Sequence, residues 1–239
     1  MPERAAPAAA DVRPGKAAAA SSGAVAPQAD DGSRPAPLPV RWIEELVNTR
    51  NMEARTDDIA TPEALASWLR ARRLLPAAAT VTAADLARAV TIRDGLRALI
   101  AVGGSVQVPG RPAGGSAVSA GGSAAPAGID PAALDDLAAL ARELPLVLRV
   151  TDGTPRLAPG DSGVSAALAA LLAVVAQAAA DGTWQRMKVC REVGCRWAYY
   201  DHSRNRSRAW CSMSVCGNRA KARAFRRRLA GAAASQPVS

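Results

Sequence analysis

The chain has 239 residues, a formal net charge of +9, and a composition that is 49% hydrophobic but only 3% aromatic. Alanine is the commonest hydrophobic residue; it buries little surface and favours helices, so we expect a mostly α protein whose core relies on scattered Leu, Val, Ile and Trp. The most apolar run, 164–180, contains Gln177 and is followed by Asp181, and the N-terminus lacks the apolar stretch of a secretory signal. These features exclude a membrane span and a secreted protein from our expectations and favour a cytoplasmic one.

The positive charge is concentrated near the C-terminus. Residues 184–228 contain 13 Lys or Arg and 2 acidic residues, whereas the rest of the chain contains 17 and 19. A concentrated basic segment is typical of proteins that bind polyanions such as nucleic acids. A solvated basic tail is the alternative.

The N-terminal part predicts a helical domain over residues 37–182, after a disordered Ala- and Pro-rich tail over 1–36. Its first helix is indicated by apolar residues at helical spacing within 40–51. Thr61-Pro62-Glu63 predicts the start of a second helix, and Thr82-x-x-Asp85 resembles a capping box that starts a third.

Residues 103–128 are rich in Gly, Ser, Ala and Pro and predict a flexible insert. Asp130-Pro131 predicts a fourth helix, and the stretch that follows predicts a small β-hairpin turning at Asp152-Gly153. A last long helix, capped by Asp161 or Ser162, should end at Gly182. Residues 231–239 are predicted to be a second disordered tail.

All four cysteines lie within 27 residues, as two pairs with four residues between the members of each pair: Cys190 and Cys195, then Cys211 and Cys216. Two thiolate pairs separated by a hairpin-sized loop predict one structural Zn²⁺ with tetrahedral coordination. Four free buried cysteines or two disulfides are the alternatives. We expect Gly194 and Gly217 to let the backbone turn beside the metal.

With four thiolates available, we expect His202 to be a surface residue of the hairpin rather than a ligand. No open metal position, nucleophile or general base is indicated, so an enzyme is not expected. Between the cysteine pairs, residues 196–201 predict a strand, 201–205 a turn and 206–210 a returning segment. The aromatic residues there are expected to build a small core around the metal in preference to stacking on bases.

Asn218 is expected to cap a basic helix over residues 219–229, with Phe225 as its apolar anchor. A helix rich in arginine beside a zinc module suits contacts with nucleic-acid phosphates, although a solvated charged face is the alternative. The candidate contacts are Arg196, Arg204, Arg206, Arg208, Arg219, Lys221, Arg223, Arg226 and Arg227.

The stretch CRWAYYDHSRNRSRAWCSMSVCGNRAKAR, residues 195–223, resembles the CGNR zinc finger family, named after Cys216-Gly217-Asn218-Arg219. Ala209 departs from the family, which usually has a basic residue there. Leu46-Val47-Asn48-Thr49-Arg50 and Thr61-Pro62-Glu63-Ala64-Leu65 look like motifs of the ABATE domain, which precedes this finger in such proteins. The resemblance implies a CGNR-type finger over 183–230, of treble-clef-like or hairpin-plus-helix form, in a bacterial, stress-associated transcription regulator.

Our first hypothesis is therefore a zinc-dependent regulator that binds DNA, or RNA, with the helical domain sensing a signal or forming a homodimer. As a DNA-binding protein it would be associated with the nucleoid. A protein-interaction module docking on an acidic partner, and a redox-sensing zinc module, are the alternatives. For Asn48, a polar residue in an apolar helix, two interpretations stay open: it caps or bends the helix, or it contacts a ligand that the domain senses.

Overall fold

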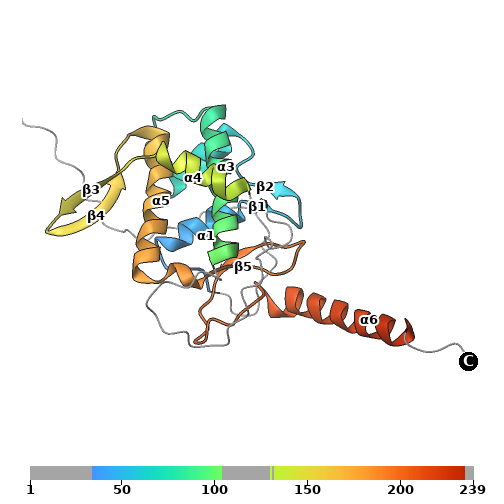
Figure 1. The fold of residues 1–239 in the computed structure, drawn as a ribbon. Helices are drawn as coiled ribbons and strands as arrows, with labels where there is room; N and C mark the ends of the chain where they lie inside the picture. The colour runs from blue at the N-terminus through green and yellow to red at the C-terminus, as the bar shows by residue number, and fades with distance from the viewer. Residues whose placement is uncertain (1–33, 104–129, 131, 235–239) are drawn as a thin grey trace, which may run out of the picture.

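The computed structural model describes residues 34–103, 130 and 132–234, with side chains to residue 230. It is mostly α, with three small antiparallel strand pairs, and so confirms the predicted fold class (Figure 1). The predicted insert lies outside the described residues except for Gly103. The same holds for residues 1–33 and 235–239 of the predicted tails.

In the described residues, five helices form the N-terminal domain. They are α1 (Val40–Asn48), α2 (Pro62–Ala71), α3 (Ala83–Gly103), α4 (Ala132–Arg142) and α5 (Gly163–Asp181). The predicted start signals are present: the Thr61 hydroxyl accepts from the Ala64 N–H at 3.2 Å, and Thr82 and Asp85 form the reciprocal bonds of a capping box. Gly182 ends α5 with a positive φ of 79°.

The main core lies where α1, α3 and α5 meet. The three helices contact one another pairwise, and α3 and α5 stand side by side with α1 across them (Figure 1). Their buried apolar residues join those of α2 and α4 in one cluster. Of the described helices, only α5 is long and apolar enough to span a membrane, but seven of its residues are buried in the structure. Its packing is that of the predicted core helix.

Both predicted tails are shorter than expected: the N-terminal tail ends before residue 34, and the C-terminal tail begins after residue 234. Residues 34–36 are ordered: Ala36 is buried, and its N–H donates to Glu44 Oε2 at 2.7 Å. At the other end, the last helix continues to Ala234 rather than stopping at 229. Ala-rich sequence after Leu229 favours helix, which explains the continuation.

The first helix is shorter than predicted. It stops at Asn48 because β1 (Arg50–Asn51) pairs with β2 (Thr56–Asp57). The guanidinium of Arg93, fully buried in α3, donates to both carboxylate oxygens of Asp57 at 2.8 and 2.7 Å. This ion pair, buried on its arginine side, fixes the small strand pair on α3.

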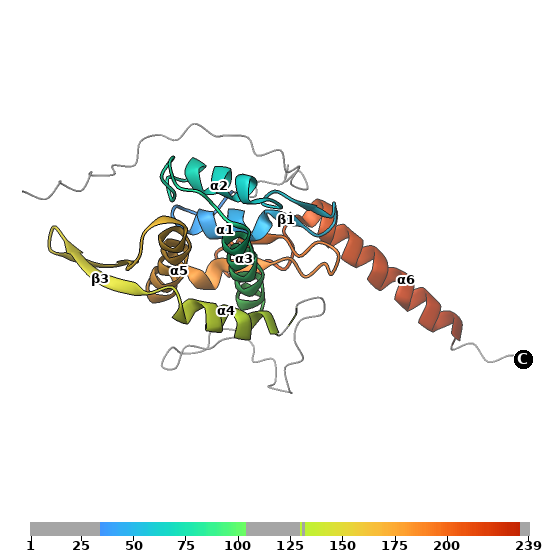
Figure 2. The same cartoon turned by 90° about the horizontal axis from the view of Figure 1, so that it is seen from above.

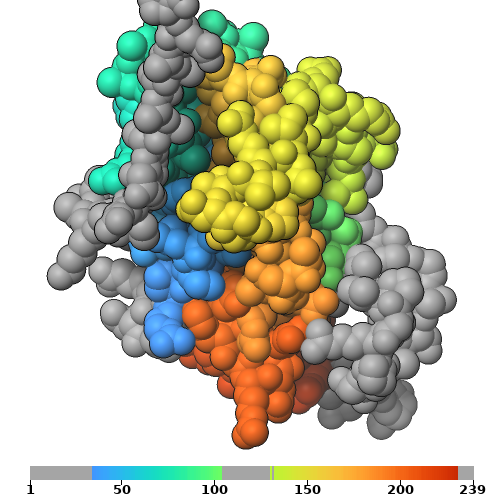
Figure 3. Space-filling model, turned by 90° about the vertical axis from the view of Figure 1, so that its left-hand side faces the viewer, coloured from blue at the N-terminus to red at the C-terminus, as the bar shows by residue number. Residues whose placement is uncertain are grey.

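The predicted hairpin is confirmed as β3 (Leu146–Thr151) and β4 (Thr154–Pro159). Asp152 and Gly153 form its two-residue loop with φ of 50° and 73°, the left-handed conformation that such tight turns require. Figure 3 shows the hairpin in yellow on the face toward the viewer. From above, it extends away from the helices on one side while α6 extends on the other (Figure 2).

The predicted strand of the cysteine-bearing segment pairs with a strand that precedes the cysteines. β6 (Ala198–Tyr200) pairs with β5 (Met187–Val189), which precedes Cys190, and not with residues 206–210. The returning segment is instead held by side chains: Lys188 Nζ donates to the carbonyl oxygens of Arg206 and Arg208. The strand predicted within 196–201 is present as β6, and the returning segment 206–210 is not paired with it.

β6 is buried on both faces. Ala198 and Tyr200 belong to the main core, whereas Tyr199 packs with the four cysteines. Successive side chains of a strand point to opposite faces, so this short strand joins two cores. The helical domain and the finger, which we divided between residues 182 and 183, therefore pack directly against each other.

Candidate metal centre and basic surface

The four cysteine sulfurs gather in one buried cluster. All four Sγ atoms lie within 4.8 Å of one another, with Cys195 and Cys216 at 3.6 and 3.7 Å from Cys211. A tetrahedral Zn²⁺ with Zn–S bonds of about 2.3 Å separates its sulfurs by about 3.8 Å. A disulfide would bring two sulfurs to about 2.05 Å, so the observed separations fit a metal and not a disulfide. The cluster is a site for one zinc ion, as predicted.

The first cysteine pair is placed by a tight knuckle. The Cys190 N–H donates to the Trp197 carbonyl at 2.9 Å, and the Cys195 N–H donates to the Glu192 carbonyl at 3.0 Å. Arg196 takes the left-handed φ of 51° that reverses the chain. We expected Gly194 to make this turn, but it is not among the residues with positive φ.

A π-helical turn, Met213–Gly217, follows Cys211 and contains Cys216. It leads directly into α6 (Asn218–Ala234). The Ser212 side chain accepts from the Val215 N–H at 3.3 Å and caps this turn. The predicted cap, Asn218, lies within the continuous helical stretch and donates to the Ser214 carbonyl at 2.9 Å instead. The helix thus begins one turn earlier than predicted.

Gly217 packs closely against its neighbours and has no positive φ. A Cβ at this position would displace the flexible side chain of Met213 and would lie 3.3 Å from Trp210 Cδ1. Trp197, Tyr199 and Trp210 pack around the cysteines, as the prediction of a small aromatic core required. His202 is exposed and lies outside the cluster, with its Nε2 3.1 Å from the carbonyl oxygens of Arg34 and Pro35.

The thiol pKa values show why the cluster needs a cation. Hydrogen bonds from Cys195 and Cys211 lower the pKa of Cys190, and the same bonds raise the pKa values of those two donors. Burial raises the pKa of Cys216. Without a metal the cluster therefore favours one thiolate and three thiols. A divalent cation is what allows four thiolates to share this space.

Asp201 organises the loop between the cysteine pairs, a role that sequence reasoning missed. It is fully buried, and it accepts from Lys188 Nζ at 2.7 Å and from the N–H groups of Ser203 and Arg208 at 2.9 and 3.1 Å. Burial alone would raise the pKa of Asp201, but the hydrogen bonds from Lys188 and Ser203 outweigh it and lower that pKa. One carboxylate thus fixes both ends of the turn 201–208.

Asn48 connects α1 to this module. Its Nδ2 donates to the Ala198 carbonyl and its Oδ1 accepts from the Ala198 N–H, both at 2.8 Å. Both ends of the amide are engaged, so Asn48 joins α1 to the finger. The polar residue in an apolar helix was the only sequence signal for this contact. The contact of Asn48 with a sensed ligand stays a prediction.

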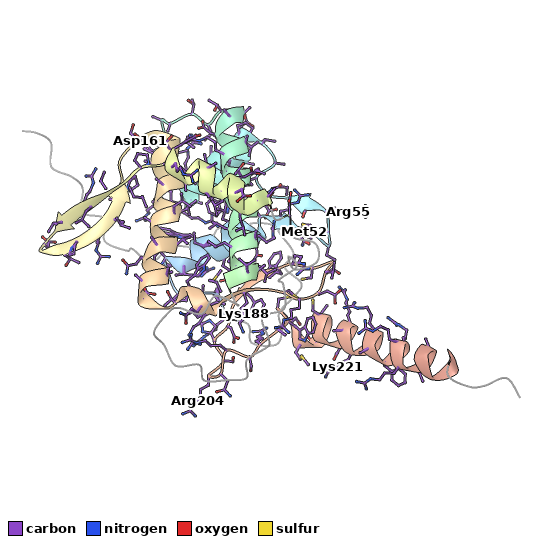
Figure 4. The ribbon with its side chains drawn as sticks, in the orientation of Figure 1. Met52, Arg55, Asp161, Lys188, Arg204 and Lys221 are labelled. Atoms are coloured by element: carbon purple, nitrogen blue, oxygen red, sulfur yellow. The ribbon has the colours of Figure 1, made fainter. Side chains whose placement is uncertain are left out.

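The predicted basic contacts fall into two groups. Arg204 lies at the tip of the turn, and Lys221 lies near the start of α6 (Figure 4). The outer group consists of these two residues and four more from α6: Arg219, Arg223, Arg226 and Arg227. The inner group, Arg196, Arg206 and Arg208, lines a cavity between the finger and α3. Arg208 donates to the carbonyls of Trp210 and Cys211, and Arg206 donates to Gln185. The inner three thus lie beside α3, apart from the outer group, and their contact with nucleic acid stays a prediction.

Comparison with protein families agrees with the division of the chain into a helical domain and a zinc finger. The model of the CGNR zinc finger matches residues 186–229, and that of the ABATE domain, described as "Putative stress-induced transcription regulator", matches residues 40–182. Neither is an enzyme family. No curated protein matches the chain. The ABATE model matches more than half of the chain, and the metal centre lies within the CGNR match. The chain therefore belongs to the ABATE family and carries a C-terminal CGNR zinc finger.

Proposed function

We propose that the chain is a zinc-dependent transcription regulator that binds DNA through α6 and the turn bearing Arg204. The observation that carries the proposal is α6 itself. This helix extends away from the rest of the molecule (Figures 1 and 2) and contains six basic residues and no acidic residue. A projecting cationic helix has the shape and charge to contact phosphates and to enter a major groove.

The base of α6 is held while its outer part is available. Arg219 pairs with Glu53 at 2.8 Å, and Arg223 pairs with Glu192 of the knuckle. For Lys221, Arg226 and Arg227, the described part of the chain provides no ion pair. These three, with Arg204, are the contacts that we favour, because their charges are not already compensated by a neighbouring carboxylate.

Phe225 does not anchor the helix as expected. It is 61% exposed, because α6 projects beyond the surface on which an anchor could pack. Together with Leu229 it offers apolar contact area four residues apart on the same helix face. Such contacts suit base edges, but they also suit the acidic protein partner that is our second candidate.

Two further parts belong to the proposal. The helical domain senses a signal or holds two copies together, and the protein acts in the cytoplasm in association with the nucleoid. The joint at Asn48 and the two-sided burial of β6 support coupling between the domain and the finger.

Fluorescence anisotropy with labelled duplex DNA at low ionic strength tests the proposal. The zinc-loaded protein should bind, and both chelation and Cys211→Ser should remove zinc and binding together, because the metal holds the start of α6 in place. Restoring zinc to the chelated wild type should restore binding. Absence of DNA and RNA binding, together with nuclease-resistant capture of an acidic protein, would replace this proposal with the second candidate.

A further inference from the structure

A cavity of about 550 Å³ lies at the joint between the helical domain and the finger. One wall is the carboxyl end of α3, with Ile100, Ala101 and Gly103. The other walls come from β5 and from the segments that follow each strand of the finger. Lys188 marks the place, at the lower end of α3 in Figure 4. The volume of the cavity is in the range of small-molecule sites.

The lining is strongly basic. Among the described residues that line it, none is acidic and five are cationic: Lys188, Arg191, Arg196, Arg206 and Arg208. Polar neutral groups from Gln185, Ser207 and Tyr199 complete it. Like charges gathered in a concave, low-dielectric space repel one another and attract an anion.

Arg196 is the residue that points most directly to a ligand. It is only 6% exposed, and its buried Nε has no hydrogen-bond partner in the described part of the chain. A buried, unpaired guanidinium N–H costs free energy unless something satisfies it. At the mouth of the same cavity, Arg191 is exposed, with its N–H bonded to the Ala209 carbonyl.

Asp201 and the zinc centre compensate part of this charge. Lys188 is paired with Asp201, and a Zn²⁺ bound by four thiolates carries a net charge of −2, which offsets two more cations. About half a negative charge at the carboxyl end of α3 also opposes an anion. Neither Arg191 nor Arg196 forms an ion pair with a residue of the described chain.

We propose that this cavity binds a small, multiply charged oxyanion, such as a phosphate or diphosphate group. Guanidinium groups present paired N–H donors that match such oxygens. Because α3 and the finger each supply a wall, a bound anion contacts both and links the helical domain to the module that carries α6. The inference is independent of DNA binding, since it rests on the cavity alone.

Calorimetric titration of the zinc-loaded full chain with inorganic pyrophosphate tests this, with added chloride holding the ionic strength constant. We expect saturable binding of one anion per chain. Arg191→Ser should weaken it about tenfold, as expected for loss of one charge-assisted hydrogen bond. Arg196→Gln should weaken it further, provided that zinc content and thermal melting show a folded protein. Arg149→Ser, on the β3–β4 hairpin, removes the same charge far from the cavity and should leave the affinity unchanged.

Non-saturable binding, or equal losses in Arg191→Ser and Arg149→Ser, would overturn the proposal, because general charge attraction would then explain the signal. A second arm titrates duplex DNA at the same salt concentration. If pyrophosphate competes with DNA and Arg191→Ser weakens both equally, the cavity is a phosphate subsite of the nucleic-acid surface and the small-anion proposal fails. Pyrophosphate binding without any DNA binding would support the cavity site and contradict only the proposed function.

Discussion

Asn48 joins the helical domain to the finger through a single side chain. Replacing it with Ala would leave the N–H and carbonyl of buried Ala198 without their partners. We expect Asn48→Ala to lower the free energy of unfolding by about 2–3 kcal/mol, the cost of unsatisfied buried backbone groups. Denaturant unfolding of the zinc-loaded protein measures the change.

Asn205→Ala is the matched control, because Asn205 is an exposed asparagine of the turn. It should change stability by no more than about 0.5 kcal/mol. Equal stability of the two variants would show that the Asn48 amide does not hold the domains together.

The four cysteines predict a pH dependence with a definite sign. Because the pKa values of Cys195, Cys211 and Cys216 are raised in the metal-free cluster, zinc must displace their protons. Zinc affinity should therefore fall as the pH is lowered, by up to about tenfold per pH unit for each proton displaced. Competition with a chromophoric chelator between about pH 6 and 8 measures this. An affinity independent of pH would contradict four-thiolate ligation.

At the scale of elements, the β3–β4 hairpin presents an apolar face without a partner in the described chain. Leu148 and Leu157 face each other across the strands and are 67% and 46% exposed. Both edges of the pair are also open, which favours association. The homodimer that we propose would use this hairpin.

Leu148→Ser combined with Leu157→Ser should convert a dimer to a monomer without loss of folding, because both side chains are exposed. Light scattering after size exclusion measures the mass. Phe225→Ser removes an equally exposed apolar side chain from α6 and should leave the dimer intact. A wild-type protein that is monomeric at high concentration, or a hairpin variant that remains dimeric, would contradict this use of the hairpin.

The elements differ in how well the sequence predicted them, and the reason is physical. Thr61, Thr82 and the Asp152-Gly153 turn act through neighbours a few residues away, so their helices and hairpin were predicted correctly. The pairing of β5 with β6 depends on which segment meets the helical body, and alternation in one short strand does not reveal its partner. The sequence pattern found the strand, and only the packing revealed its neighbour.

The same limit applied to the candidate site. Cysteine spacing predicted the metal ligands because every ligand is a cysteine and all four lie close together in the chain. Arg196 and Arg226 could not be distinguished, because both are arginines in a basic segment. Their difference lies in long-range packing: Arg196 is buried at the joint with α3, whereas Arg226 is exposed on α6.

At the scale of the whole molecule, zinc, the joint and the projecting helix form one arrangement. The metal fixes the start of α6, Asn48 and β6 tie the metal module to the helical domain, and the basic cavity lies between them. A signal received at the joint would therefore act next to the element that we propose contacts DNA. This arrangement makes the binding of α6 to phosphates the central claim.

The salt dependence of DNA binding tests that claim most directly. For the zinc-loaded protein, the logarithm of the binding constant should fall linearly with that of the salt concentration, by about 0.9 per phosphate contacted. Arg226→Ser combined with Arg227→Ser should make this slope shallower by about 2. The control pair Arg149→Ser and Arg156→Ser, which are cross-strand neighbours in the hairpin, changes the net charge equally and should leave the slope unchanged. No binding at low salt, or equal slopes for the two double variants, would contradict the account.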